Sequence, residues 1–379
     1  MDFELDQDHR VLRDSVREFT ASEIAPEAID IDEKHRIPPE LIAKIASMGY
    51  LGSYIPEEYG GAGLDILSYA ILVEEVSRAC ASSGILISAH TSLACDPILH
   101  FGTEAQKLRF LPPLARGEKI GCILLTEPEA GSDVANISTT YRREGDEFII
   151  TGGKIFITNG AFLGTGIVFA SKDRSLKHKG LSAFIVDLAS KGVQVLRNEN
   201  KLGIRGSSTT AFALEEVRVP VSNLLGEECR GFKIAMETLN GGRIGVASQA
   251  LGIAQGALAR SISYAKERRQ FGNPISDLEA IQFKLADMYL RVEASRLLVW
   301  QAACRKDAGL SFSTESALAK LHASETAVFV TREAVQIHGG YGYVTEYEVE
   351  RMFRDAKITE IYEGTSEVQR LVIARSLLS

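Results

Sequence analysis

One carboxylate in this sequence is a candidate general base. Glu363 lies in the string YEGTSE, and the spacing of Ser366 and Gln369 matches a capping box, which predicts that the last helix begins just after Gly364. Burial could bring the pKa of such a glutamate near the operating pH, although a nearby helix N-terminus would lower it. The string alone fits equally well an acid that only stabilises the first turn of a helix.

The other candidate residues also have structural explanations. Thr126, Phe156 and Thr158 fall in β-rich strings, where a residue usually faces its own sheet. Arg268, in ERRQ, is typical of a solvated helix face, and Gly339-Gly340 is typical of a glycine C-cap. None of these residues predicts a function by itself.

Composition and charge exclude several classes of protein. The chain has 379 residues, room for two or three domains, with 45% apolar and 24% charged residues, as in globular proteins. Its net charge is -8 and basic residues are mixed with acids throughout, so nucleic acid is not expected as a partner. No run of about 18 apolar residues predicts a membrane span.

The cysteines and the N-terminal string bear on the compartment. The five cysteines show no paired spacing, which argues against a zinc site or a disulfide framework and favours a reducing compartment. The string MDFELDQDHR is acidic and lacks an apolar stretch, so no secretory signal is expected and the predicted location is cytoplasmic. We expect no metal ligands, and His338 is expected to be structural.

The periodicity changes twice along the chain. Residues 1–119 are predicted to be helical, with Pro38-Pro39 opening a helix that Gly49 closes and a buried helix after residue 80 broken near Pro97. Residues 120–224 alternate with period two and predict a β-domain, with a two-residue hairpin turn at Gly152-Gly153.

The last part of the chain returns to helical periodicity. Residues 225–379 predict long helices suited to a bundle and to subunit contacts, including one over 313–338 that Gly339-Gly340 ends. Thr345 and Glu348 have capping-box spacing. The α-β-α order argues against a doubly wound sheet, and no glycine-rich nucleotide motif follows a strand.

Six strings, in the expected order and spacing, together resemble the acyl-CoA dehydrogenase family. They are LTEPEAGSD at 125–133, KIFITNG at 154–160, GGRIGVASQALGIAQGA from 241, ERRQFG at 267–272, QIHGGYGY at 336–343 and IYEGTSEVQR at 361–370. The resemblance implies a helical domain, a β-barrel domain and a four-helix-bundle domain, assembled as a homotetramer with one FAD per subunit. It also implies α,β-dehydrogenation of an acyl-CoA, with electrons leaving to an electron-transferring flavoprotein.

The resemblance assigns roles residue by residue. Glu363 is the implied base for the α-proton, while flavin N5 takes the β-hydride. In some relatives the base precedes the residue that here is Arg243, and this chain has Gly242 there, which supports Glu363. The implied FAD contacts are Thr126, Ser132, Phe156, Thr158, Arg268, Gln270, Phe271, Gln336, Gly339, Gly340, Thr365 and Glu367. The implied substrate contacts are Ser132, Asn240, Arg243, Gly364, Thr91 and Asp96.

The sequence does not distinguish between short, branched and alicyclic acyl groups. Segment 81–100 has no Lys or Arg. This argues against a glutaryl-type substrate, because the distal carboxylate of such a substrate needs a cationic partner. Asp96 fits a helix cap before Pro97 better than a polar group in the acyl pocket. An alicyclic substrate would place Thr91 and Asp96 near its ring.

Two other functions remain as alternatives. An acyl-CoA oxidase or nitroalkane-type oxidase on the same fold would pass electrons to oxygen and release peroxide. A catalytically silent flavin-binding or CoA-ester-binding protein would lack turnover. The intact string around Glu363 argues against the silent protein.

Overall fold

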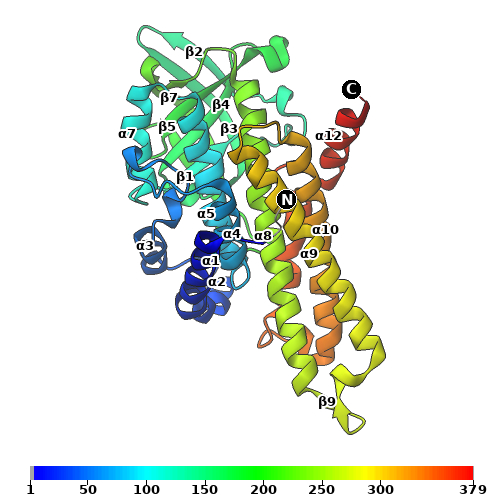
Figure 1. Cartoon of the computed structure of the whole chain (residues 1–379). Coiled ribbons are helices and arrows are strands. Elements are labelled where there is room, and N and C mark those ends of the chain that lie inside the picture. Colours follow the sequence, from blue (N-terminus) through cyan, green and yellow to red (C-terminus); the bar gives the residue numbers. More distant parts are fainter. Residues whose placement is uncertain (1–3, 379) are drawn as a thin grey trace.

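The computed structural model describes residues 4–378, so residues 1–3 and 379, at the outer ends of the first and last predicted domains, lie outside the described residues. The described chain runs from helices to strands and back to helices, in the predicted order (Figure 1). One apolar core joins the helices to the outer face of the sheet, and a second lies inside the sheet. No helix of the described residues is long and apolar enough to cross a bilayer.

The first part of the chain is a set of short helices around two buried ones, α4 and α5. The helices are α1 (Gln7–Phe19), α2 (Ala28–Glu33), α3 (Pro39–Ser47), α4 (Ile66–Ser77), α5 (Ala81–His90), α6 (Asp96–Phe101) and α7 (Glu104–Ala115). Helix α3 begins after Pro38, and Gly49 follows its end with a φ of 74°, so that prediction is confirmed.

The predicted break near Pro97 is wrong. A π turn, Thr91–Cys95, joins α5 to α6, and the chain stays helical until Gly102. Pro97 lies in the first turn of α6, where a helix does not need the N–H that proline lacks. The wider turn before it, in which the Asp96 N–H donates to the Thr91 carbonyl, takes up the change of register.

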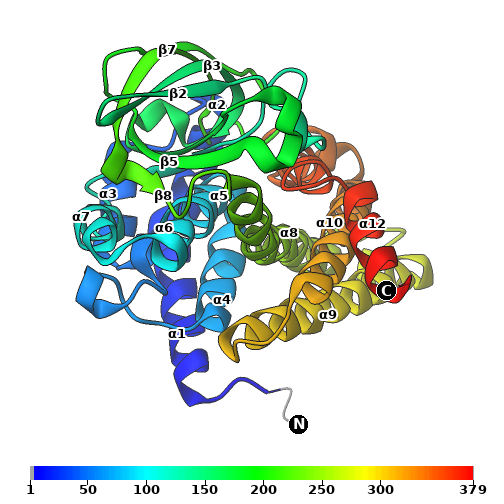
Figure 2. The ribbon, with the colours of Figure 1, turned by 90° about the horizontal axis from the view of Figure 1, so that it is seen from above.

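The middle part is a curled eight-stranded sheet. Its strands are β1 (Gly121–Leu124), β2 (Thr140–Glu144), β3 (Glu147–Thr158), β4 (Thr165–Ser171), β5 (Leu181–Asp187), β6 (Val193–Asn198), β7 (Thr209–Pro220) and β8 (Leu224–Leu225). The strand order is β6-β7-β3-β2-β4-β5-β8, with β1 beside β4. Seen from above, β7, β3 and β2 lie opposite β5 (Figure 2). The sheet thus curls around its own core as the barrel prediction requires, although its pairing ends at β6 and β8.

The predicted hairpin at Gly152-Gly153 is wrong. Both glycines lie inside the continuous strand β3, beside a bulge in its pairing with β7. A Cβ on Gly152 would come within 2.4 Å of Thr139 Oγ1, so glycine is needed there for close packing and not for a turn. The turn lies at Gly145-Asp146, between β2 and β3, where Gly145 has a φ of 61°.

The last part is built on three long helices, α8 (Gly231–Glu267), α9 (Glu279–Asp307) and α10 (Ser313–His338), with a short hairpin of β9 (Arg269–Gln270) and β10 (Asn273–Pro274). Two shorter helices, α11 (Val349–Ala356) and α12 (Ser366–Leu378), both pack on α10, and α11 also packs on α8. Gly339 ends α10 as predicted, with a φ of 60°. The predicted cap at Thr345 is wrong, because α11 begins after Glu348 with no side-chain cap.

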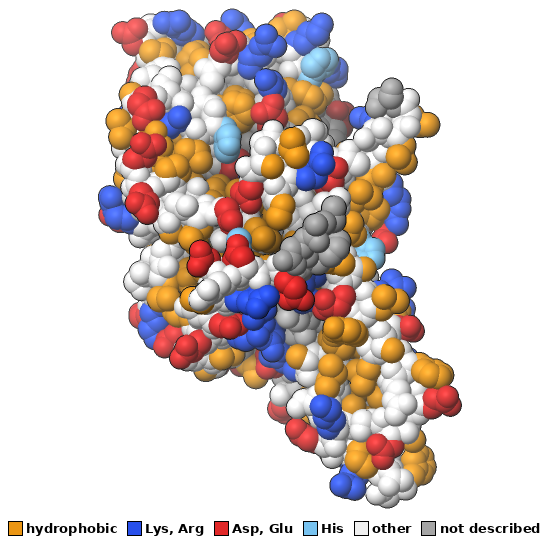
Figure 3. All heavy atoms as spheres, in the orientation of Figure 1, with side chains coloured by type: hydrophobic (Ala, Val, Ile, Leu, Met, Phe, Trp, Pro, Cys, Tyr) orange, Lys and Arg blue, Asp and Glu red, His pale blue; other side chains and the backbone are white. Residues whose placement is uncertain are grey.

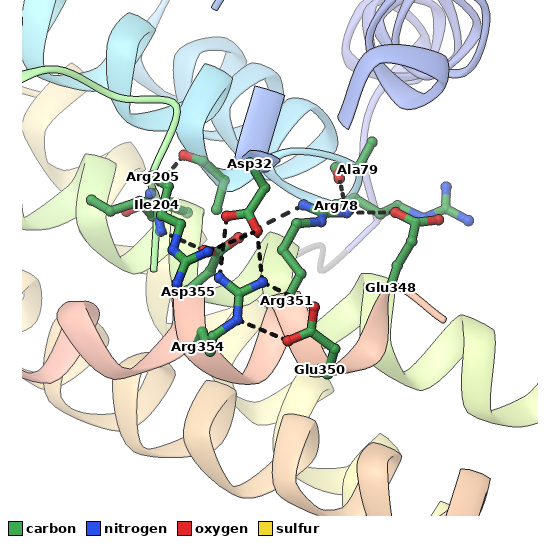
Figure 4. Close-up of polar contacts among 12 residues, drawn as sticks. Asp32, Arg78, Ala79, Ile204, Arg205, Glu348, Glu350, Arg351, Arg354 and Asp355 are labelled. Atoms are coloured by element: carbon green, nitrogen blue, oxygen red, sulfur yellow. Dashed lines mark hydrogen bonds and ion pairs between the residues drawn. The ribbon is translucent and has the colours of Figure 1, made fainter. Parts of the chain in front are cut away.

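A buried group of charged residues fastens α11 to the rest of the molecule (Figure 4). Arg354 binds Asp32 of α2 at 2.7 Å, and Arg351 donates to the Ala79 carbonyl at 3.0 Å. Asp355 accepts from the backbone N–H of Ile204, in the loop between β6 and β7. Since α11 leads directly into the segment that carries Glu363, these contacts set where that segment lies.

Candidate active site

The backbone of Glu363 has an uncommon conformation. Glu363 and Gly364 have φ values of 51° and 94°, and α12 begins two residues later at Ser366. The capping side chain is that of Thr365, whose Oγ1 accepts from the Val368 N–H at 3.3 Å, so the predicted capping box on Ser366 is wrong. A left-handed non-glycine residue costs free energy, and such residues gather at functional sites.

The Glu363 carboxyl group is directed toward α8. Its Oε2 is inaccessible to solvent and has no hydrogen-bond partner among the described residues, although the residue as a whole is only half-buried. A Cβ built on Gly242 would fall 2.0 Å from this Oε2 and 2.7 Å from Leu93 Cδ2. A side chain at position 242 would therefore occupy the space of the Glu363 carboxyl group. Glycine at this position leaves room for the carboxyl group.

Burial sets the acidity of Glu363. It raises the pKa of the carboxyl group to about 7, against the opposing effect of the positive charges of Lys320 and Arg243. Arg243 is itself buried and donates to Asn240 Oδ1 at 2.6 Å, and burial lowers its pKa. A carboxylate with a free oxygen and a pKa near neutrality can remove a proton from a carbon acid.

The residues predicted to lie along a flavin ring come together on the sheet. The Ile155 N–H donates to the Thr126 carbonyl at 3.0 Å, which joins the strings around Thr126 and Thr158. Phe156 has a φ of 56° at the second bulge of β3, and the residue is 58% exposed. An exposed aromatic ring beside two threonines fits the face of a large aromatic cofactor.

A buried ion pair that the sequence analysis missed supports this surface. Lys154 Nζ lies 2.7 Å from Glu127 Oε1 with both side chains buried. Burial would raise the pKa of Glu127, but Lys154 and the donors of Ser138 and Thr139 outweigh it, and the pKa falls to about 2. Burial lowers the pKa of Lys154 to about 8. The charged residue at an inward position of β3 was the signal that could have revealed the pair.

A second group of predicted FAD contacts lies at the far end of the bundle from the sheet. Figure 1 shows the β9–β10 hairpin at this end. Phe271 is 91% exposed there with a φ of 53°, and the Arg268 guanidinium lies 5.3 Å from the centre of the Tyr341 ring. Apart from the adjacent residues in the chain, no atom of the described residues lies within 4 Å of a Cβ built on Gly339 or Gly340, so the backbone there is open to a ligand.

The predicted flavin-ring residues therefore lie on the sheet, and Arg268, Phe271, Gly339 and Gly340 lie on a separate surface at the far end of the bundle. The open surfaces fit the two halves of a dinucleotide, with the guanidinium available for a phosphate group. Gln270, Gln336, Ser132 and Glu367 are exposed, and Thr365 stands beside Glu363. His338 is structural as expected, since its ring stacks on Tyr264 and its Nδ1 binds the Ala334 carbonyl.

Two predicted substrate residues differ from expectation. Asp96 is not a helix cap, because it has helical dihedral angles and its Oδ1 lies 2.9 Å from Lys306 Nζ of α9. It lines a cavity of about 410 Å³ together with Asn240, and the cation missing from segment 81–100 is supplied by a distant helix. Thr91 is fully buried and donates to the Ile87 carbonyl at 2.9 Å, so its only hydroxyl proton is already used.

Comparison with known proteins identifies the family. Models of the acyl-CoA dehydrogenase N-terminal, middle and C-terminal domains match residues 6–118, 122–217 and 229–378. The short-chain specific acyl-CoA dehydrogenase of Clostridium acetobutylicum is 51% identical over 99% of both chains.

Two solved structures are also similar over their whole length. Butyryl-CoA dehydrogenase from Megasphaera elsdenii has a TM-score of 0.98 at 47% identity, covering 100% of both chains. A chain in a structure described for the electron transferring flavoprotein of Acidaminococcus fermentans has a TM-score of 0.98 at 49% identity, again over 100% of both. With three matching domains in chain order and a relative 51% identical over 99% of both chains, this protein belongs to the acyl-CoA dehydrogenase family of FAD-dependent oxidoreductases.

Proposed function

We propose that Glu363 is the base that removes the α-proton of an acyl-CoA thioester. The observation that carries this proposal is the inaccessible Oε2, which has no hydrogen-bond partner and belongs to a carboxyl group with a pKa of about 7. A carbon acid beside a thioester needs a base that is ionised near neutral pH and not held in an ion pair. FAD, when bound, accepts the hydride from the β-carbon.

The acyl group is proposed to be short. Tyr69 of α4 fills the space beside Gly245, since a Cβ there would lie 2.3 Å from the Tyr69 hydroxyl. That hydroxyl is near enough to Glu363 for the carboxylate to add to the effect of burial in raising the pKa of Tyr69. The relative from Clostridium acetobutylicum, named for short chains, supports the same choice over branched and alicyclic substrates.

FAD is proposed to be shared between subunits of a homotetramer. Within one chain the sheet surface around Phe156 and the hairpin surface around Phe271 lie far apart, so a neighbouring subunit would bring them together (Figure 1). Helix α9 also presents exposed Phe283, Tyr289 and Leu290. Figure 3 shows hydrophobic side chains gathered over the long bundle, as a subunit interface requires.

The proposed electron acceptor is an electron-transferring flavoprotein. It is supported by the similarity to a chain from the Acidaminococcus fermentans structure. An oxidase would instead release peroxide during rapid aerobic turnover without an added acceptor. The cytoplasmic location, expected from the unpaired cysteines, stays a prediction.

Anaerobic single turnover tests the base. The purified yellow holoenzyme is mixed with butyryl-CoA and with longer, branched, cyclic and dicarboxylic CoA esters, and bleaching of the flavin absorption is followed. Glu363→Gln should keep FAD and bind the thioester yet fail to bleach. Glu325→Gln, a surface carboxylate of α10 paired with Arg370, is the matched control and should bleach normally. Normal bleaching by Glu363→Gln would refute the assignment.

A further inference from the structure

Lys320 is a buried cation at the site to which neither the resemblance nor the comparisons assign a role. It lies in the middle of α10, fully buried, and its Nζ donates to the Gly364 carbonyl at 2.7 Å. Its Nζ forms no ion pair with a carboxylate of the described residues, and Glu363 acts on it only through its charge. A buried lysine without a paired acid is costly, so its place next to Glu363 calls for an explanation.

The carbonyl that Lys320 binds belongs to the strained part of the backbone. Gln369 Nε2 is a second donor to the same Gly364 oxygen, at 2.8 Å. The two donors hold the carbonyl from α10 and from α12, across the left-handed residues Glu363 and Gly364. Strained backbone persists only where neighbouring contacts fix it.

We propose that Lys320 is a positioning residue for proton abstraction: it fixes the Glu363–Gly364 backbone through the Gly364 carbonyl, and it holds a positive charge near the carboxylate while leaving both carboxylate oxygens free. This proposal for Lys320 rests on Glu363 being the base, as proposed above. A direct ion pair would occupy an oxygen that must receive the proton and would make the carboxylate a weaker base. Binding the neighbouring carbonyl leaves both oxygens free, and the cation then lowers the carboxyl pKa only through its charge and not through a hydrogen bond.

The charged and titratable groups around the carboxyl group are consistent with this role. Glu363 faces Lys320 from α10, Arg243 from α8 and Tyr69 from α4, and its neighbour Tyr362 is half-buried with its hydroxyl bound to Gln249. Of the two cations, Lys320 opposes the effect of burial on the Glu363 pKa more strongly than Arg243.

Lys320 remains protonated at neutral pH. Burial lowers its pKa to about 8, and the charge of Glu363 opposes that effect most strongly among its neighbours. Arg243 lowers the Lys320 pKa further, while Glu360 and Glu367 raise it. The positive charge is therefore present at the pH where Glu363 must ionise.

The test is the pH dependence of anaerobic flavin bleaching by butyryl-CoA, measured from about pH 5 to about pH 9. Glu363 acts when ionised, so the rate rises with pH through its pKa. Lys320→Met removes the cation, which should move this rise upward by about one pH unit and slow bleaching about tenfold below it. Gln369→Met removes the other donor without changing the charge, and should lower the maximal rate without moving the rise.

Two further variants keep the test decisive if Lys320→Met does not fold. Lys320→Arg retains the charge and should bleach with the wild-type pH dependence even if its maximal rate falls. Lys320→Gln retains a donor without the charge and should show the upward shift. A purely structural lysine would instead lower FAD content and thermal stability in all variants with no shift. That result overturns the role proposed for Lys320.

The proposal for Lys320 and the proposal for Glu363 fail in different ways. Normal bleaching by Glu363→Gln would refute the assignment of Glu363 as the base, and with it the role of Lys320. An inactive Glu363→Gln together with an unshifted Lys320→Met would leave the base in place and overturn only the role of Lys320.

Discussion

Glu363→Gln is expected to make the folded protein more stable above neutral pH while abolishing turnover. In the folded protein burial raises the carboxyl pKa from 4.5 to about 7. Ionising this group therefore costs more free energy in the folded protein than in the unfolded chain, and ionisation lowers the stability of the fold. At about 1.4 kcal/mol per pKa unit, the cost reaches about 3 kcal/mol once the pH exceeds 7. Glutamine has nearly the same volume and carries no charge, so the variant escapes this cost.

The sign of the pH dependence distinguishes this effect from other consequences of the substitution. A raised folded-state pKa means that wild-type stability is fully present below pH 4.5 and is lost as the pH rises through about 7. The difference between variant and wild type should therefore be smallest near pH 5 and grow to on the order of 5 °C in thermal midpoint at pH 8. Any constant contribution from the new amide cancels in this comparison.

The measurement is thermal unfolding of the holoenzymes by circular dichroism at matched FAD content, at several pH values between about 5 and 8. Glu325→Gln is the control, since it makes the same substitution at a surface carboxylate of α10 that is paired with Arg370. A Glu363→Gln midpoint that differs from wild type by the same amount at every pH would refute the argument that burial raises the pKa of this carboxyl group.

Three other substitutions test the geometry of the site. Gly242→Ala places a methyl group where Glu363 Oε2 lies, and should slow single-turnover bleaching at least tenfold while FAD content stays normal. Lys154→Met leaves Glu127 buried without its cation and should destabilise the protein by about 3 to 5 kcal/mol, seen as a lower denaturant midpoint with loss of FAD. Arg268→Ala should lose FAD or tetramer more than chemistry; unchanged flavin content and size in gel filtration would contradict the intersubunit role.

Most of the element order could be predicted because it follows from local periodicity. Helix α10 has the predicted bounds, since an amphipathic run and the glycine pair after it are both visible in the sequence. The predictions that failed depended on neighbours distant in the chain. Gly152 resembles a turn residue in the sequence, but glycine is needed there because Thr139 packs directly against it. Asp96 resembles a helix cap in the sequence, but its side chain forms an ion pair with Lys306 of α9.

In the candidate site, too, the features that depend on local sequence could be predicted, and those that depend on distant neighbours could not. Glu363 could be singled out because the string around it resembles a known family and because Gly242 leaves only one carboxylate for the role. The free Oε2, the left-handed backbone and the cation of Lys320 could not be foreseen, because they arise where α8, α10 and the segment before α12 meet.

By itself, the amino-acid sequence determined the family, the α-β-α order and the identity of the candidate base, since these depend on residue types and their spacing along the chain. Only the tertiary structure decided the state of that base. Burial between helices sets the pKa of Glu363, and the contacts of Lys320 and Gln369 with Gly364 hold it in place, because desolvation and charge act through space between residues far apart in sequence.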